Sequence, residues 1–357
     1  MKTYIKFLIF GFIKSFFNVF LLMITLILIL NILKEIEFFS NKDVNSFYPI
    51  YLSVLSSASV VFEMFPFIFL ISTQFFFLKL FDNDEISIFK YSGLKNISII
   101  KILSIISFLM GVLIITIFYT LSSNLQNYYL QVKNQFSKDK LHLAVINKNG
   151  LWIKDNINEE ISIINSSKIN DNFLVDTFIT VFNKDFKLIK SFKSDKIDIK
   201  NNEWLVYDAI VYENNSKKKI DLIKFKSNFN QKRIESLFSN LSSLSILELI
   251  NLRQNYKLLN YSIVDVDMQI YKIFTYPIFL VLMTIISCMI MFNTKHSNSR
   301  VLKIIIGLFF SVGIYYINNF FNVMGSTEKI PLIISIWSPI VFLTLINLTM
   351  LININEK

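Results

Sequence analysis

The sequence predicts an α-helical integral membrane protein with six transmembrane helices and an inserted all-β, jelly-roll-like domain. Hydrophobic residues make up 53% of the 357 residues and charged residues only 17%, against about 25% charged in soluble proteins. Six apolar runs reach the roughly 20 residues that a spanning helix needs. The longest polar stretch between them has the length of one ordinary domain.

The apolar runs set the order of the predicted parts. The first run is too long for a signal-peptide core, and no small-residue cleavage site follows it. Residues 1–122 are therefore expected to carry spans one to three, residues 123–267 the inserted domain, and residues 268–357 spans four to six. The runs lie near 7–33, 50–78, 98–122, 271–292, 301–323 and 331–352.

Lysines indicate how the spans are oriented. Lys2, Lys6 and Lys14 lie at the start of span one, and the short loops after spans two and four are also basic. The positive-inside rule therefore predicts that both termini are cytoplasmic and that the insert lies outside the cytoplasm. Pro66 and Pro277 interrupt spans two and four, where neighbouring helices can satisfy the freed carbonyls. Either proline marks a packing kink or a functional hinge.

The insert alternates apolar and polar residues in short runs, which is typical of strands. Asparagine-rich dipeptides at 149–150, 201–202 and 214–215 predict turns, so an all-β sandwich or jelly roll is expected. A capping box from Ser245 to Glu248 predicts a short amphipathic helix near 245–258. The predicted strands include 141–146, 151–153, 161–164, 177–182, 204–207 and 220–225.

Several function classes are excluded by what the chain lacks. Its one cysteine, Cys288, excludes a disulfide framework, and none of the seven glycines is followed by lysine, so there is no phosphate loop. The predicted topology places His142 and His296 on opposite sides of the membrane. The net charge of +10 comes from scattered lysines, which does not indicate nucleic-acid binding. No cofactor and no metal are expected, and the chain cannot hydrolyse ATP alone.

Two acidic groups have alternative interpretations. Residues 82–85 and 265–267 could bind a divalent ion in a membrane enzyme. The first group also directly precedes a short predicted helix that ends at Gly93, and acidic residues favour helix N-termini. Inside the spans, Glu63 either faces a polar cavity or pairs with a basic group. Lys34, at the outer end of span one, either snorkels or holds an anionic lipid head group.

The order of these features is similar to that of one known family. Three spans, an outer β domain and three further spans accompany a cytoplasmic helix at 85–94 and the stretch Gly-Leu-Trp-Ile-Lys-Asp at 150–155. Together they resemble the lipopolysaccharide export permeases LptF and LptG over essentially the whole chain. The 150–155 stretch and the chain length resemble LptG more than LptF.

This resemblance implies a permease subunit of an ABC transporter in the bacterial inner membrane, with its β domain in the periplasm. It implies an LptF-like paralogous permease, an LptB-like ATPase dimer and an LptC-like single-span protein as partners. The complex would extract lipopolysaccharide and pass it to a periplasmic bridge for export to the outer membrane. ATP hydrolysis would reside in the partner, in agreement with the missing phosphate loop.

The resemblance also implies roles for individual residues. A coupling helix near 84–93 would contact the ATPase, and basic residues would meet lipid phosphates, although the sequence around Lys133 lacks the arginines of the family. Acyl chains are expected against span one, and a dry groove is expected within the β domain. The residues expected at the ATPase are Asp84, Glu85, Phe89 and Gly93, those at the lipid are Lys34, Lys133, Phe20, Ile24 and Ile27, and those in the groove are Trp152 and Phe178.

Other functions fit parts of the same pattern. A membrane-anchored sensor or scaffold would use the β domain to bind a ligand and would need no cytoplasmic ATPase. An enzyme acting on lipid-linked sugars would require Asp82, Asp84 or Asp265 to bind metal. A permease for lipoprotein or another lipid would keep the same architecture with a different cargo.

Overall fold

The computed structural model describes residues 3–40, 44–45, 47–136, 151–157, 160–170, 172–213, 216–231, 234, 240–258, 262–293 and 300–355. The chain divides into a helical unit and a β unit. The helices of the chain are α1 Thr3–Phe39, α2 Phe47–Asp82, α3 Glu85–Tyr91, α4 Asn96–Leu113, the π-helix η1 Ile114–Tyr119, α5 Thr120–Gln135, the 3-10 helix η3 Leu241–Ser243, α7 Ile246–Leu258, α8 Val264–Asn293, α9 Arg300–Ser326 and α10 Leu332–Asn355.

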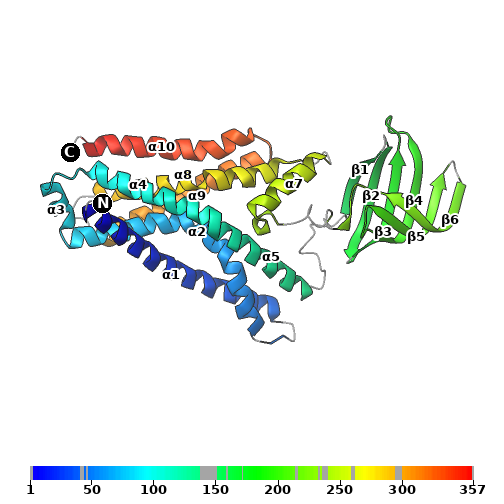
Figure 1. Ribbon diagram of the computed structural model, residues 1–357, viewed down its shortest axis with the longest axis horizontal. Helices are drawn as coiled ribbons and strands as arrows, with labels where there is room; N and C mark the ends of the chain where they lie inside the picture. Colours follow the sequence, from blue (N-terminus) through cyan, green and yellow to red (C-terminus); the bar gives the residue numbers. More distant parts are fainter. Residues whose placement is uncertain are drawn as a thin grey trace. The chain divides into compact units, whose positions relative to one another are not determined.

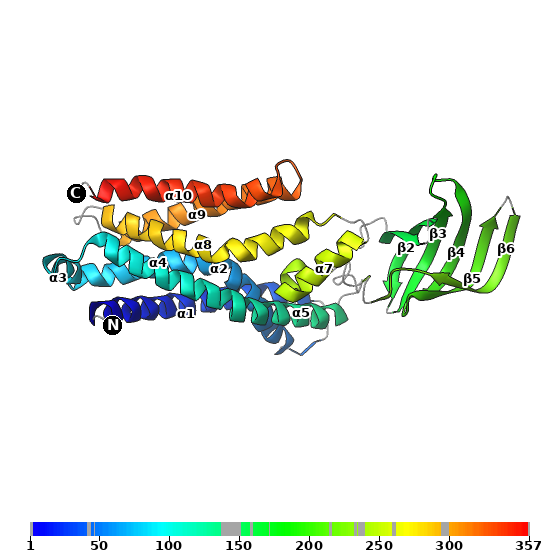
Figure 2. The same cartoon turned by 45° about the horizontal axis from the view of Figure 1, so that its top comes forward.

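The described residues contain six helices that are long and apolar enough to cross a membrane, which confirms the predicted number of spans. The third runs without a break from α4 through η1 into α5, so residue 123 lies inside a helix. Helices from the two ends of the chain lie side by side in one bundle (Figure 1). The start of α1, the end of α10 and the short helix α3 lie at the same end of that bundle (Figure 2).

Helices α2 and α8 form the centre of the bundle. α8 has the largest buried share of its apolar window, 61%, whereas α9 and α1 have the smallest, 17% and 22%. Phenylalanines fill the contact between α1 and α2, where the Phe16 ring lies 5.0 Å from Phe69 and the Phe20 ring stacks on Phe65 at 5.8 Å. α1 and α9 therefore keep most of their apolar surface exposed.

Small polar side chains join the central helices at close range. Ser287 of α8 donates a hydrogen bond to the Leu70 carbonyl of α2 at 2.8 Å, and the hydroxyls of Ser107 and Thr284 lie 2.9 Å apart between α4 and α8. A Cβ added at Gly111 of α4 would lie 3.0 Å from the backbone of Pro277. Hydroxyls and small residues allow helices to approach closely where lipid provides no hydrophobic driving force.

The β unit is one antiparallel sheet whose six strands follow the chain in order. An inserted β domain is thus confirmed, but its described strands form a meander rather than the crossing strand order of a jelly roll or the two layers of a sandwich. Short turns explain this, since each strand pairs with the next. The strands are β1 Leu151–Ile157, β2 Glu160–Asn170, β3 Phe173–Phe182, β4 Leu188–Asp198, β5 Glu203–Glu213 and β6 Ser216–Lys226.

A line of kinks crosses the sheet from β2 to β6. The pairing on either side of it places Ser167, Asp176, Asp195, Asp208 and Asp221 opposite one another. Asp176 and Asp208 have φ angles of 48° and 47°, a left-handed conformation that aspartate tolerates better than most residues. The kinks bend the sheet and shift the buried positions by one residue.

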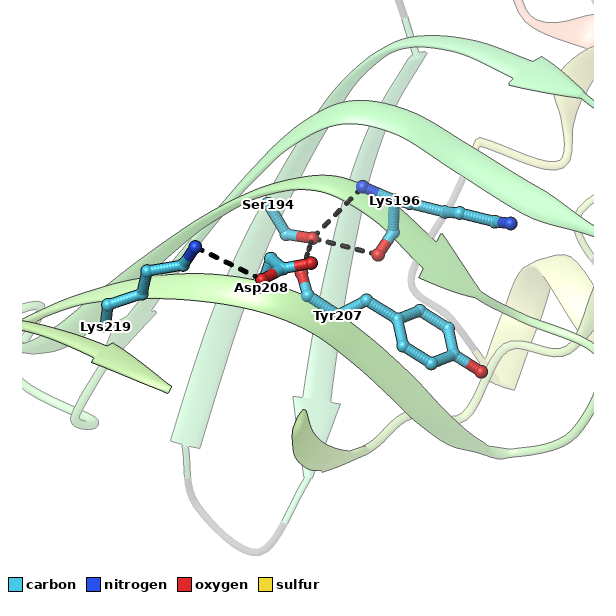
Figure 3. Close-up of polar contacts among 5 residues, drawn as sticks. All are labelled: Ser194, Lys196, Tyr207, Asp208 and Lys219. Atoms are coloured by element: carbon cyan, nitrogen blue, oxygen red, sulfur yellow. Dashed lines mark hydrogen bonds and ion pairs between the residues drawn. The ribbon is translucent and has the colours of Figure 1, made fainter. Parts of the chain in front are cut away.

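Serine side chains hold these kinks in place (Figure 3). The buried Ser194 hydroxyl lies 2.6 Å from the Tyr207 carbonyl and 2.9 Å from the Lys196 carbonyl, and it accepts a hydrogen bond from the Lys196 N–H. Lys219 forms an ion pair with Asp208 at 3.2 Å. Ser166 makes equivalent contacts, to the carbonyls of Val175 and Lys168, at the kink between β2 and β3.

The predicted capping box is confirmed at the start of α7. The Glu248 carboxylate accepts hydrogen bonds from the Ser245 N–H and hydroxyl, both at 2.8 Å, and the Glu248 N–H donates back to the Ser245 hydroxyl. Other predictions lie outside the described residues: the strand at 141–146, the turns at 149–150 and 214–215, and both histidines.

Candidate functional site

The outward face of α1 combines an apolar row with a terminal cation. Leu22, Leu26 and Leu30 follow one another at four-residue spacing and expose 61%, 46% and 57% of their surface, and the exposed Lys34 continues the row by one further turn. With Thr25 and Ile29, the three leucines line a shallow hollow of about 430 Å³. The arrangement suits a ligand with an apolar body and an anionic head.

The helix turn that carries Lys34 is fixed from its buried side. Glu35 is 1% exposed and accepts a hydrogen bond from the Tyr129 hydroxyl of α5 at 2.8 Å. One turn earlier, Asn31 donates to the Ser57 hydroxyl of α2 at 2.9 Å. Adjacent residues lie about 100° apart around a helix, and Lys34, next to the buried Glu35, is exposed. Sequence reasoning singled out Lys34 but missed Glu35, although an acidic residue beside a span was a signal.

The three residues expected to contact acyl chains lie differently from the exposed row. Ile27 is only 4% exposed and belongs to the buried core, so its side chain does not reach the outward face. Phe20 and Ile24 are half-buried against the same core. Span one is apolar on every side, so the sequence contained no periodicity that distinguishes the two faces. Lys133 is half-buried on α5, one turn beyond Tyr129.

Helix α3 has well-defined ends, as the sequence predicted. Asp84 precedes it with a left-handed φ of 54°, and the Asn83 amide donates to the Glu85 carboxylate at 3.1 Å. At the other end Gly93 has φ 78°, its N–H bonds the Lys90 carbonyl, and the Leu94 N–H bonds the Phe89 carbonyl. This pair of bonds is a Schellman motif, which stops the helix at glycine.

Helix α3 has one face in the bundle and one face outside it. Ile86 is buried, and the Phe89 ring meets the Phe7 ring of α1 edge-on at 6.0 Å. On the other side Ile88 is 59% exposed and Tyr91 is 92% exposed, and Asp84, four residues before Ile88, is exposed as well. Exposed apolar side chains beside a charge are typical of a protein-binding surface. Of the residues expected to contact the ATPase, Phe89 lies on the inner face of α3, where it packs against α1.

Trp152 and Phe178 share a face of the β sheet. Asn165 of β2 pairs with both of them, so the three side chains form one row across β1, β2 and β3. Trp152 is 59% and Phe178 42% exposed, whereas the opposite face carries the apolar core, including Ile153 and Ile179. The dry interior of this domain is therefore the face opposite to the two residues that the sequence suggested.

Asp155 has a structural role that the sequence did not reveal. It is 1% exposed and accepts hydrogen bonds from the Ser227 hydroxyl at 2.7 Å, the Asn228 N–H at 2.9 Å and the Asn228 amide at 2.8 Å. These contacts join the first strand to the segment that follows the last strand. Close by, the Trp204 indole N–H donates to the Phe229 carbonyl at 2.7 Å. The contacts of Asp155 and of Trp204 hold the segment after β6 against the sheet, which curls over its apolar face.

The described part of the chain contains no group of three or more histidine, cysteine, aspartate or glutamate side chains that could hold a metal ion. Cys288 is buried in α8. Glu63 is exposed on α2.

The chain matches one family model. A family model described as "Lipopolysaccharide export system permease LptF/LptG" matches residues 6–353, nearly the whole chain. No curated protein matches the chain in a sequence search. The family match confirms the resemblance seen in the sequence, and the model covers LptF and LptG together.

Proposed function

The chain belongs to the LptF/LptG family of lipopolysaccharide export permeases, and we propose that it is one half of an ATP-driven transporter in the bacterial inner membrane. The family makes it a multi-pass membrane protein and a transporter subunit rather than an enzyme. In the proposal it pairs with a paralogous permease above an ATPase dimer. A single-span partner and a periplasmic bridge receive the cargo, and the β domain lies in the periplasm.

The observation that carries the proposal is the row from Leu22 to Lys34 on α1. Lipopolysaccharide has phosphorylated sugars on an acyl-chain anchor, and it needs a cation at the membrane surface above an apolar wall. Lys34 supplies the first, and Leu26 and Leu30 supply the second. The ammonium group of lysine binds phosphate as a point charge. Phe20 and Ile24 would support this wall from behind, and Lys133 would add a second cation.

Energy input follows from the size of the cargo. Each buried methylene of an acyl chain contributes about 0.8 kcal/mol to membrane retention, so several long chains cannot leave quickly without work. Helix α3 supports an ATPase as the source, because Asp84, Glu85 and the exposed side chains of Ile88 and Tyr91 provide a compact cytoplasmic docking surface. Gly93 gives that surface a fixed end.

The β domain would continue the path. Its curled sheet has an apolar face that suits acyl chains, and partner β domains can extend a sheet by strand addition. Among the described strands, β1 and β6 are the edges, and β6 carries Lys217, Lys218 and Lys219 in succession. Edge lysines disfavour strand addition, which makes β1 the proposed meeting edge. Trp152 would then lie on the outer side of that edge strand.

Photocrosslinking in cells tests the proposal. A photoreactive amino acid is placed in turn at Leu26, Leu30 and Lys34, and adducts are detected by blotting for lipopolysaccharide. Ile27 provides a matched control, because it neighbours Leu26 but faces the core. We expect adducts at the three exposed positions and none at Ile27. Absence of adducts at all three, or equal adducts at Ile27, would contradict lipopolysaccharide binding on this face.

A further inference from the structure

A buried polar contact joins α2 to the first turn of α9. Gln74 is 0% exposed, and its amide nitrogen donates a hydrogen bond to the backbone carbonyl of Lys303 at 2.8 Å. The Gln74 carbonyl oxygen has no hydrogen-bond partner among the described residues. A buried amide with one unmade hydrogen bond costs stability, so this contact is not explained by stability alone.

The two helices approach each other very closely here. Gly307 lies one turn after Lys303, and a Cβ added to it would overlap the Gln74 amide. A side chain at position 307 would therefore require the buried Gln74 amide to move. This contact joins the first turn of α9, the least buried span, to α2.

A second contact links the same turn of α9 to the end of α2. Lys303 is only 5% exposed, and its ammonium nitrogen lies 4.7 Å from the centre of the Phe81 ring. A cation over an aromatic ring is attracted most strongly where water is excluded. The Phe81 carbonyl accepts a hydrogen bond from the Asp84 N–H at 3.2 Å, in the turn that leads into α3.

Helix α3 is thus connected to both of the least buried spans. Phe89 meets Phe7 of α1, and the turn at Phe81 holds Lys303 of α9. A displacement of α3 would be carried to α1 through one contact and to α9 through the other, because close-packed side chains transmit strain.

We propose that Gln74, Phe81 and Lys303 form a transmission joint that transfers movement of α3 to α9. This inference rests on the proposed function, in which an ATPase moves α3. The three are positioning residues, since none of them is placed in contact with cargo or nucleotide. Loss of the joint should separate ATP hydrolysis from lipid movement while the fold is kept.

The test uses the complex of this chain with its paralogous permease and ATPase in proteoliposomes that contain lipopolysaccharide. Lys303→Met removes the cation but keeps the length of the side chain and the backbone carbonyl, whereas Lys303→Arg retains a cation. We expect Lys303→Met to lower lipopolysaccharide release per ATP by about three- to tenfold, and Lys303→Arg to restore most of it. Phe81→Leu should behave like Lys303→Met, and Phe81→Tyr like the unchanged protein.

Two controls separate transmission from folding. Lys101→Met removes an exposed lysine of α4 and should leave the ratio unchanged. Thermal unfolding midpoints should be similar for Lys303→Met and Lys303→Arg. If Lys303 had only a structural role, Lys303→Met would lower the unfolding midpoint as well as the lipopolysaccharide released per ATP. The proposed joint would be overturned if Lys303→Met released as much lipopolysaccharide per ATP as the unchanged protein. It would also be overturned if the loss of release across the variants paralleled the loss in unfolding midpoint.

A distance measurement distinguishes failure of the joint from failure of the proposed function. Spin labels at Lys90→Cys and Phe309→Cys, both at exposed positions, report α3 against α9, and the single native cysteine is buried. We expect the distance to change on adding ATP and vanadate, and Lys303→Met to abolish that change. If the unchanged complex hydrolyses ATP without releasing lipopolysaccharide, the proposed function fails while this distance still decides the joint.

Discussion

The Tyr276 hydroxyl of α8 donates a hydrogen bond to the Phe62 carbonyl of α2. Phe62 lies four residues before Pro66, so its carbonyl is the one that loses its helical donor to the proline ring. The expectation that a neighbouring span satisfies the freed carbonyl is therefore confirmed at Pro66. The rings of Tyr276 and Tyr119 lie 4.7 Å and 5.0 Å from the Phe62 ring, which brings η1 to the same level.

Tyr276→Phe should destabilise the helical unit by about 0.6–2 kcal/mol, because it leaves the Phe62 carbonyl without a donor in an apolar environment. In a Pro66→Ala background the same substitution should cost less, since the introduced alanine would supply the missing N–H. Thermal unfolding in detergent of the unchanged protein, the two single variants and the double variant measures this double-mutant cycle. An equal cost in both backgrounds would show that Tyr276 does not replace the lost donor.

Lys34→Ala should reduce lipopolysaccharide crosslinking from a probe at Leu30 by about fivefold, the effect of removing one lysine near a membrane surface. Lys34→Arg should retain most of the crosslinking, because the charge is kept. Lys14→Ala provides the control, as Lys14 is exposed near the opposite end of α1. An equal loss in both alanine variants would indicate a general charge effect rather than a phosphate site.

Gly93→Val should lower the amount of ATPase that copurifies with the chain. Gly93 has a φ angle of 78°, which a β-branched residue adopts only with strain, so the end of α3 would be displaced. Gly93→Asn should be tolerated, because asparagine also ends helices in this conformation. Nothing lies within 4 Å of a Cβ added at Gly93, so steric clash cannot cause the difference. Equal copurification of both variants would argue against α3 as the docking element.

Asp155→Ala should open the curled sheet at a cost of about 3 kcal/mol or more, since three hydrogen bonds to a buried carboxylate are lost. Limited proteolysis of the full chain in detergent should then cleave the β domain faster. Asp221→Ala, which removes an exposed carboxylate from β6, should change the cleavage rate little. Unchanged protection of Asp155→Ala would mean that Trp204 and the apolar core suffice to hold the segment after β6 against the sheet.

Local chemistry made parts of the structure predictable. The capping box at Ser245 and the helix that ends before Gly93 follow from residues a few positions apart, and both are present. Strand β4 was not predicted, because its buried residues Phe192, Ser194 and Ile197 break the two-residue alternation at the kink line. That line depends on hairpin lengths, which bring aspartates of four separate strands into register.

The sequence by itself determined the number of spans, the inserted β domain and the family, because apolar run lengths and short motifs are properties of neighbouring residues. Only the tertiary structure decided which side of α1 is outward, since every side of that helix is apolar. Glu35 and Ile27 face inward because partners on α2 and α5 select one rotation of the helix, leaving Leu26, Leu30 and Lys34 outside. Contacts between distant segments, such as Gln74 with Lys303, similarly arise from packing alone.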